Sequence, residues 1–324
     1  MPIVNRPQDL VLDDLYIDLS LLRRHLYVKC EGFNFAGSAK LKTAVAMVEG
    51  AERRGQLTDG SVVVESTSGN LGVALALVCA ERGYPFISVL DPLCNTSTRR
   101  IIEALGAHVM VVDRKDARGG YLGTRIETVR DLCRSNPAYV WLDQYTNGEN
   151  WRAHYERTAA AVDARFPTLD YLFVGTGTGG TLMGCARYFK ERDRPTRIVA
   201  VDVVGSVTFG GPAGPRRLPG LGTSRHSRMV DVSYVDEVVL VDEAETIAMC
   251  RRLARHGYLL GASTGSVLSG ALTTLAGASE DAVAVAIAPD LGERYVHTVY
   301  DDGWVEEHFE GAPAAHDFSS PIAL

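Results

Sequence analysis

The sequence predicts an α/β protein of two domains, each built on a mostly parallel, twisted sheet flanked by helices. Its length of 324 residues exceeds what one hydrophobic core usually organises, which favours two domains. From about residue 60, short β-rich runs alternate with helix-length amphipathic stretches, as in the βαβ units of parallel sheets. A polar, turn-prone stretch at residues 147–150 divides this alternation into two series. We therefore expect two sheets, with a ligand site in the cleft between them.

The first series predicts a smaller domain over residues 43–147. Its runs of β-branched and aromatic residues are separated by stretches with helical periodicity. The expected strands are 61–65, 86–90, 108–112 and 139–142, and the expected helices include 70–82 and 97–105.

The remainder, residues 1–42 plus 148–312, predicts the larger domain. Within it, the Gly- and Pro-rich segment 210–222 is expected to form a long loop over the cleft. The tail at 313–324 lacks apolar periodicity, and we expect it to be disordered. The expected strands of this domain are 171–174, 197–201, 237–241, 258–260 and 282–287.

Charge and composition exclude several classes of function. The formal net charge of −7 leaves no basic footprint for nucleic acid. No apolar run approaches the roughly 20 residues that span a bilayer, and the N-terminus lacks the pattern of a signal peptide. The six cysteines are scattered, without a Cys-x-x-Cys pair or a histidine at metal-ligand spacing. We expect a cytoplasmic protein with reduced thiols and no metal, nucleic-acid or membrane partner.

A glycine-rich loop over residues 175–180 lies between the apolar strand 171–174 and a helical run that begins near Thr181. Glycines let the backbone approach a ligand closely, and amide groups at a helix N-terminus bind phosphate. The same residues satisfy the dinucleotide fingerprint, with Asp202 placed to take a ribose. Taken alone, the loop indicates a nicotinamide enzyme, and a turn without a ligand is the plainer alternative.

Lys40 ends the segment Asn-Phe-Ala-Gly-Ser-Ala-Lys and stands at the start of a helix predicted over 39–54, with Ser38 as its N-cap. There the ammonium faces the positive end of the helix dipole, and burial would disfavour its charge further. The result is a neutral, nucleophilic amine. Lys42 is a rival on another face of the helix, and an ordinary surface lysine is the plain alternative.

Two further patterns place short donors at helix starts. Thr67, Ser68, Gly69 and Asn70 follow a predicted strand and open a helix, an arrangement that suits a small carboxylate or serves only as capping chemistry. Ser263 lies in Gly-Ala-Ser-Thr-Gly between a predicted strand and a helix, where a lone serine is normally a cap.

The four patterns, in this order, resemble the fold type II pyridoxal-5'-phosphate (PLP) enzymes, in particular the cysteine synthase and cystathionine β-synthase group, from about residue 10 to 310. The resemblance implies PLP in the interdomain cleft, carried on Lys40 as the internal aldimine, and a homodimer. In a nicotinamide enzyme, Lys40, the loop ending at Asn70 and Ser263 would have no function.

The resemblance also implies roles for the other residues of the site. Ser263 would meet the pyridine nitrogen and Asn70 the 3'-oxygen. Because a hydroxyl does not hold that nitrogen protonated, prompt β-elimination is favoured over a long-lived carbanion. The phosphate would be held by Gly177, Thr178, Gly179, Gly180 and Thr181, and the substrate carboxylate by Thr67, Ser68, Gly69, Asn70 and Gln144.

Departures from the usual cysteine synthase motifs narrow the resemblance. Glu65 and Ser66 precede the carboxylate loop, Leu71 follows it, and Tyr145 stands where phenylalanine is usual. These features are similar to the branch that makes 2,3-diaminopropionate precursors, as in siderophore or other natural-product biosynthesis. That branch joins O-phospho-L-serine to L-glutamate by β-replacement through an α-aminoacrylate.

On this chain the resemblance makes Lys40 the general base. Tyr145 would bind substrate or assist proton transfer, and Arg225 would pair with the leaving phosphate or the glutamate side-chain carboxylate. A cysteine synthase that uses sulfide with O-acetylserine or O-phosphoserine is the alternative within the family. A NAD-dependent dehydrogenase is the more distant one.

Overall fold

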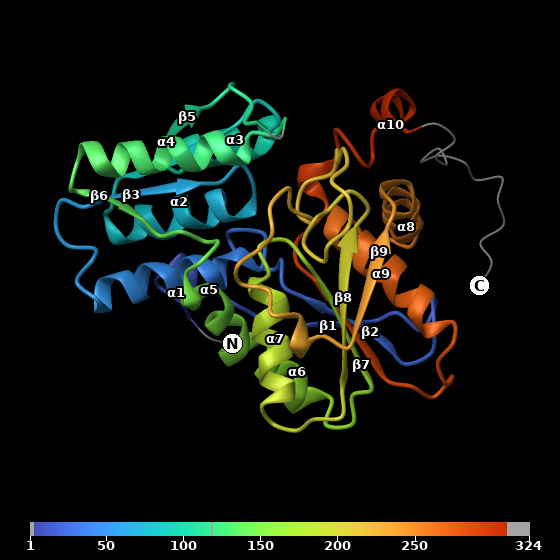
Figure 1. The fold of residues 1–324 in the computed structure, drawn as a ribbon. Helices are drawn as coiled ribbons and strands as arrows, with labels where there is room; N and C mark the ends of the chain where they lie inside the picture. The colour runs from blue at the N-terminus through green and yellow to red at the C-terminus, as the bar shows by residue number, and fades with distance from the viewer. Residues whose placement is uncertain (1–2, 118, 310–324) are drawn as a thin grey trace.

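The computed structural model describes residues 3–117 and 119–309, which fold around two separate sheets (Figure 1). Among the described strands only the pair β1–β2 is antiparallel, and all other neighbours run parallel. The predicted α/β class with mostly parallel sheets is therefore confirmed. The tail at 313–324, expected to be disordered, lies outside the described residues. On the two sheets we propose the domain division 43–147 against 1–42 plus 148–312.

The smaller sheet has the order β5-β4-β3-β6 and is covered on both faces. α4 packs on one face, and α2 packs on the other with α1 outside it (Figure 1). Because α2 lies between α1 and the sheet, its residues 71–79 are all buried, and it carries apolar residues around its whole circumference. The elements are α1 (Lys40–Arg53), β3 (Val62–Ser66), α2 (Asn70–Arg82), β4 (Phe86–Leu90), α3 (Thr96–Ala104), β5 (His108–Val111), α4 (Leu122–Ser135) and β6 (Tyr139–Trp141).

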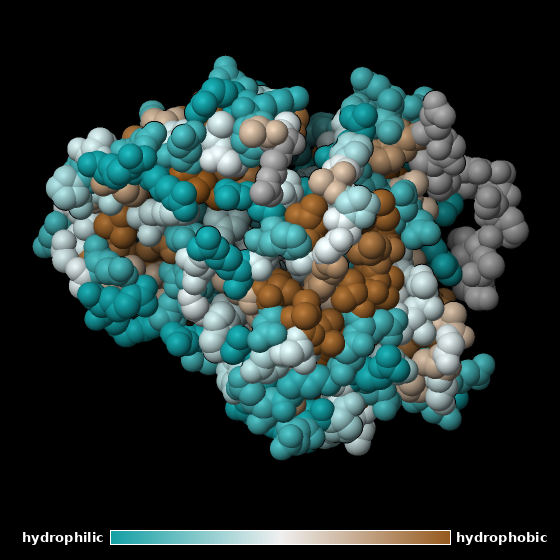
Figure 2. All heavy atoms as spheres, viewed as in Figure 1, coloured by the Kyte–Doolittle hydropathy of each residue, from teal (hydrophilic) through white to brown (hydrophobic). Residues whose placement is uncertain are grey.

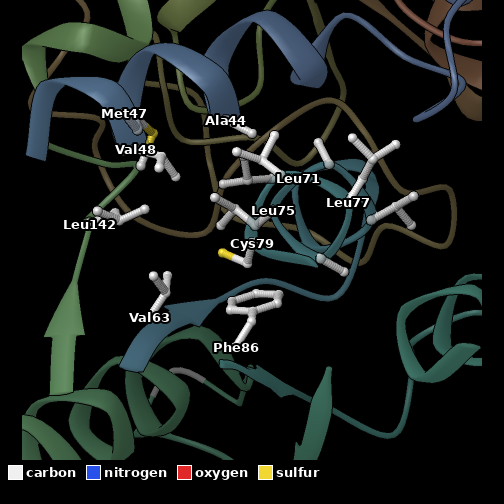
Figure 3. Close-up of a cluster of buried hydrophobic side chains, with 14 of the residues drawn as sticks. Ala44, Met47, Val48, Val63, Leu71, Leu75, Leu77, Cys79, Phe86 and Leu142 are labelled. Atoms are coloured by element: carbon white, nitrogen blue, oxygen red, sulfur yellow. The ribbon is translucent and has the colours of Figure 1, made fainter. Parts of the chain in front are cut away.

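Figure 3 shows how this packing is made. Leu75 of α2 points between Met47 of α1 and Phe86 of the sheet, and all three are buried. Burying such side chains stabilises each by roughly 1.5–3 kcal/mol relative to exposure, which fixes the middle of α1 against α2.

The larger sheet has the order β1-β2-β10-β7-β8-β9. α8 and α9 cover one face, and α6 and α7 cover the other near β7. Its elements are β1 (Tyr16–Asp18), β2 (Leu26–Cys30), α5 (Gly148–Ala153), a π-helical turn η2 (His154–Ala159), α6 (Ala160–Arg165), β7 (Tyr171–Gly175), α7 (Gly180–Lys190), β8 (Arg197–Val203), β9 (Glu237–Val241), α8 (Glu243–Arg255), α9 (Ala262–Leu275), β10 (Ala284–Ala288) and α10 (Asp302–His308), with 3-10 turns η1 (Pro7–Asp9), η3 (Val232–Tyr234) and η4 (Glu293–Tyr295).

Two local predictions are wrong. The run 258–260 forms no strand, because its only ladder contact is a single bridge between Leu260 and Leu291 before the chain turns into α9. Ser38 does not cap α1: the cap is Ala39, and the Ser38 hydroxyl is buried without a partner. The backbone of Ser38 pairs instead with Asp290 in an isolated bridge, which holds the start of α1 against the larger sheet.

Candidate active site

A cavity of about 1150 Å³ lies where the two sheets face each other, at the carboxyl ends of their central strands. The loops after β3 and β7, the start of α1 and the loop around 213–224 all line it. All predicted site residues except one lie on its wall. They are Lys40, Thr67, Ser68, Gly69, Asn70, Gln144, Tyr145, Gly177, Thr178, Gly179, Gly180, Thr181 and Ser263.

Lys40 is the first residue of α1 and lines the cavity with a half-buried side chain. Burial lowers the pKa of its ammonium to about 8, and no carboxylate within residues 3–117 and 119–309 offsets this effect. Lys42 has very different surroundings: its side chain is buried between Glu31 at 2.7 Å and Asp13 at 2.6 Å. The structure therefore separates an amine whose pKa burial lowers from one that is paired with two carboxylates.

The loop between β7 and α7 has a backbone that only glycine can adopt. Gly179 has a φ of +96°, in the left-handed region. A Cβ on Gly177 would lie 2.7 Å from the Gly220 carbonyl oxygen, and one on Gly180 would lie 2.1 Å from Asn150 Oδ1. The first amides of α7 have no partner within the helix, so the loop forms a close-fitting cradle for an anion.

The turn from β3 into α2 carries side chains that do not cap the helix. Its N-cap is Gly69, and no side chain accepts a cap hydrogen bond there. Ser68 Oγ instead accepts a hydrogen bond from Arg125 Nη1 at 3.0 Å. Asn70 Nδ2 donates to Asp290 Oδ2 at 2.8 Å, and Arg294 Nη1 donates to Asn70 Oδ1. The hydroxyls and amides of this turn are therefore directed at the cavity and at the opposite domain.

Ser263 is buried on the cavity wall and is not a cap, since the N-cap of α9 is Gly261 without a side-chain bond. The chain passes directly above it at Gly220, whose φ is +111°. A Cβ there would lie 2.2 Å from Ser263 Oγ. The loop thus closes over the hydroxyl, as predicted for segment 210–222.

Gln144 and Tyr145 are hydrogen-bonded to β3 behind the turn 67–70. Both donate to the Ser66 carbonyl oxygen, Gln144 Nε2 at 2.9 Å and the Tyr145 hydroxyl at 3.3 Å. Burial raises the pKa of Tyr145 to about 12, so the phenol remains a proton donor at neutral pH. Glu65 is fully buried beside them and accepts from Trp141 Nε1 at 3.0 Å, and burial raises its pKa to about 8.

Arg225 is the predicted residue that the structure does not bring to the site. Its side chain is exposed and does not line the cavity, although Ser224 and His226 do. The Thr223 hydroxyl donates to the Arg225 carbonyl oxygen, which belongs to a turn that directs the side chain outward. The expected place of Arg225 on the cavity wall is therefore wrong in this structure, and its binding of substrate stays a prediction.

Arg125 is the arginine that the sequence analysis missed. It comes from α4, is only 9% exposed, and lines the cavity with Nη1 at 3.2 Å from Asp91 Oδ2. An arginine at a buried position of an amphipathic helix is the signal that could have found it. Among the described lining residues, basic side chains outnumber acidic ones: Lys40, Lys115, Arg125, Arg216, Arg217 and Arg294 stand against Asp91 alone.

Asp202, the ribose ligand of the nicotinamide alternative, is not available to a ligand. It is fully buried in β8, accepts from the Val203 amide and does not line the cavity. In the part of the chain that the structure describes, no cluster of three metal-ligating side chains is found. Nor is any helix there long and apolar enough to cross a membrane.

Comparison with known proteins gives one family and several relatives. The family described as "Pyridoxal-phosphate dependent enzyme" matches residues 16–290. N-(2-amino-2-carboxyethyl)-L-glutamate synthase of Ralstonia nicotianae is 40% identical over 288 residues, which cover 87% of this chain and 84% of the relative. The synthase of the same name from Cupriavidus metallidurans is 39% identical over 285 residues, covering 86% and 84%.

Solved structures give the same likeness of fold. O-ureido-L-serine synthase superimposes with a TM-score of 0.85 at 30% identity, covering 94% of this chain and 100% of that one. A hydrogen sulfide-producing enzyme from Fusobacterium nucleatum gives a TM-score of 0.83 at 29% identity, covering 90% and 100%.

Proposed function

The chain belongs to the pyridoxal-phosphate-dependent enzyme family, and from this premise we propose that it joins O-phospho-L-serine to L-glutamate. Phosphate leaves, and the product is N-(2-amino-2-carboxyethyl)-L-glutamate, a 2,3-diaminopropionate precursor. The observation that carries the proposal is the charge of the cavity. A wall on which six basic side chains face one carboxylate suits a cofactor and two substrates that are all anions.

The residues of the cavity fit PLP. The glycine cradle leaves no room for a Cβ, Lys40 lacks an ionic partner, and Ser263 is buried beneath the Gly220 loop. We assign the phosphate to Gly177, Thr178, Gly179, Gly180 and Thr181, the pyridine nitrogen to Ser263, the 3'-oxygen to Asn70 and the covalent link to Lys40. When bound, PLP supplies the electron sink that lets the Cα proton of the substrate leave.

Asn70 can serve the 3'-oxygen without losing its present contacts. Its amide nitrogen has two hydrogens, and Asp290 takes only one of them. Its oxygen is occupied by Arg294, which fixes the amide so that nitrogen and oxygen cannot exchange places. The second hydrogen is therefore the one proposed to reach the cofactor.

Lys40 is proposed to move the proton at Cα of O-phospho-L-serine. A pKa near 8 lets the amine take up a proton and release it again near neutral pH, as a general base and then a general acid must. The carboxylate of the substrate would rest at the turn 67–70 with Gln144, where short donors and the start of α2 meet.

We propose that Arg125, rather than Arg225, holds the leaving phosphate. Asp91 and Ser68 fix its guanidinium at the wall, and its fork of donors matches a phosphate. Tyr145 lies close enough that the positive charge of Arg125 lowers the phenol pKa against the larger effect of burial. Tyr145 would donate to the same group by exchanging its long hydrogen bond to the Ser66 carbonyl oxygen, at 3.3 Å, for one to the phosphate.

A homodimer in the cytoplasm completes the proposal. β9 is an edge strand of the larger sheet, and its Val238 and Leu240 are 40% and 50% exposed. They lie in register with Ala200 and Asp202 of the neighbouring strand β8. Apolar side chains gather over β8 and β9 in the space-filling view (Figure 2), and a second copy would cover them. Light scattering on purified protein tests this: a monomer would contradict it.

Incubation of the holoenzyme with defined amino acids tests the reaction. With O-phospho-L-serine and L-glutamate we expect phosphate release and one new product with the mass of N-(2-amino-2-carboxyethyl)-L-glutamate. With O-acetylserine or O-phosphoserine plus sulfide we expect little cysteine. Efficient cysteine formation without a glutamate adduct would instead establish a cysteine synthase and overturn the proposal.

A further inference from the structure

Two fully buried polar residues, Asn150 and His154, lie directly behind the glycine cradle and have no role so far. Asn150 belongs to α5, and His154 opens the π-helical turn that follows. Asn150 Nδ2 lies 3.2 Å from Thr178 Oγ1, and His154 Nε2 lies 3.2 Å from Thr181 Oγ1. Since π-helical turns interrupt regular helices and often mark functional sites, the two residues are candidates for a role in the cradle.

The orientation of the Asn150 amide follows from a partner that can only accept. Its Nδ2 donates to the Gln144 carbonyl oxygen at 2.7 Å, so its Oδ1 is the atom that faces Thr43 Oγ1 at 3.2 Å. An amide oxygen cannot donate, and the Thr43 hydroxyl must therefore give its proton to Asn150. The second Nδ2 hydrogen goes to Thr178, whose oxygen accepts.

The proton on His154 follows in turn. Because Thr43 has given its single proton away, its oxygen must accept from His154 Nε2, 3.2 Å away, which places the ring hydrogen on Nε2. On the other side, Thr158 Oγ1 accepts from Lys42 Nζ at 3.2 Å and keeps its own proton for His154 Nδ1 at 3.1 Å. A neutral ring satisfies every contact when its one Nε2 hydrogen is shared between two acceptors, Thr43 Oγ1 and Thr181 Oγ1, each 3.2 Å away.

The charges around His154 favour the same neutral form. Burial lowers its pKa to about 3, and Lys40, Lys42 and Lys29 act in the same direction, against Glu31. Lys42 in turn is held by Glu31 and Asp13. Lys42, the second lysine at the start of α1, thus has a separate role. Its hydrogen bond to Thr158 Oγ1 keeps the Thr158 hydroxyl as a donor to the ring.

We propose that Asn150 and His154 are positioning residues that make the hydroxyls of Thr178 and Thr181 hydrogen-bond donors toward the anion in the cradle. Each threonine oxygen accepts from behind, which leaves its proton for the cavity side. No acceptor within residues 3–117 and 119–309 takes either proton. The inference rests on the cofactor placement proposed above, because a phosphate bearing two negative charges needs donors and cannot donate itself.

Nitrogen NMR of ¹⁵N-histidine-labelled protein tests the ring directly. The His154 signals, assigned by their loss in His154→Gln, are expected to show a protonated Nε2 and a bare Nδ1 in apoprotein and holoprotein alike. A ring with its hydrogen on Nδ1, or one carrying both, would overturn the inference. This result does not depend on which substrates the enzyme joins.

Cofactor titration of apoprotein tests whether the orientation of these hydroxyls contributes to phosphate binding. His154→Leu should weaken PLP binding by about tenfold or more, since a bond to a charged group is affected, and should leave the affinity for pyridoxal, which lacks the phosphate, unchanged. His154→Gln, which can still donate at that position, should restore PLP binding. In a Thr181→Val background the change at His154 should add little further loss.

Equal weakening of PLP and pyridoxal, or full additivity with Thr181→Val, would show a merely structural role. If His154→Leu does not fold, His154→Gln is compared with Thr181→Val. Thr181→Val should lose affinity for PLP but not for pyridoxal, and His154→Gln should keep both affinities. Failure to bind PLP at all would overturn the proposed function, while the NMR result would still decide the state of the ring.

Discussion

The two walls of the cavity hold their polar groups in different ways. On the larger sheet, the cradle before α7 is fixed by glycine geometry and by the buried residues Asn150 and His154 behind it. On the smaller sheet, the groups around the start of α2 are held by charged side chains such as Arg125 and by contacts of Asn70 across the cleft. A rigid wall suits a cofactor that stays, and a wall of exchangeable ionic contacts suits substrates that come and go.

Lys40 stands where the walls meet, so its replacement should have the largest effect. Lys40→Ala removes the residue that we propose as both the link to the cofactor and the base, and turnover should fall about 10³-fold or more. Phosphate release from O-phospho-L-serine measures it. Because the side chain has no ionic partner in the part of the chain that the structure describes, the free energy of unfolding should change little. Normal turnover in this variant would remove Lys40 from the mechanism.

A change in the rigid wall should act on the cofactor. In Gly180→Ala the new methyl group meets Asn150 Oδ1, and overpacking of this kind typically costs about 1–3 kcal/mol. We expect the PLP dissociation constant to rise by roughly tenfold to a hundredfold, measured by titration of apoprotein. Gly277→Ala is the control, since nothing lies within 4 Å of its Cβ position. Equal PLP affinity in both variants would contradict a close-fitting cradle.

A change in the ionic wall should act on the substrate and spare the cofactor. Arg125→Met is expected to raise KM for O-phospho-L-serine by about tenfold, because a bond between charged groups is lost. The PLP dissociation constant should stay the same. Arg225→Met is the matched control, since that exposed side chain lies off the cavity, and its KM should not change. If Arg225→Met raised KM and Arg125→Met did not, the proposal that Arg125 binds the leaving phosphate would be wrong.

The smallest expected effect concerns Glu65, behind the substrate wall. Burial raises its pKa from 4.5 to about 8, so between these values the folded chain holds a proton that the unfolded chain has lost. Glu65 therefore makes the protein less stable as pH rises through this window. Glu65→Gln should remove this contribution to the pH dependence of the free energy of unfolding, which is measured by urea unfolding at pH 5 and pH 8. Identical slopes in the two proteins would show that Glu65 is ionised throughout.

Local patterns were sufficient where one short segment determines the structure. The apolar runs before Gly175 and Glu65, followed by glycine or hydroxyl residues, identify strand, turn and helix in order, and the structure has β7–α7 and β3–α2 there. Lys40 could likewise be singled out by its place at a helix start. The run 258–260 was misleading because three apolar residues fit a buried turn as well as a strand.

Residues whose role depends on distant partners could not be found in this way. Arg125 reaches the cavity through the packing of α4, and Arg225 turns away through a loop contact. The proposed role of His154 depends on its contacts with Thr43, Thr158 and Thr181. These residues are up to 138 positions apart in the chain, but all three contact the same ring. Side-chain direction, rather than residue type, decided each case.

Identification of the lysine that carries the cofactor decides whether Lys40 is the attachment site. Borohydride reduction of the holoenzyme fixes PLP on that lysine, and proteolysis with mass spectrometry locates it. Lys40 and Lys42 lie two residues apart, one without an ionic partner and one held between two carboxylates. We expect the label on Lys40 alone. A label on Lys42, or protein that remains unlabelled, would contradict it.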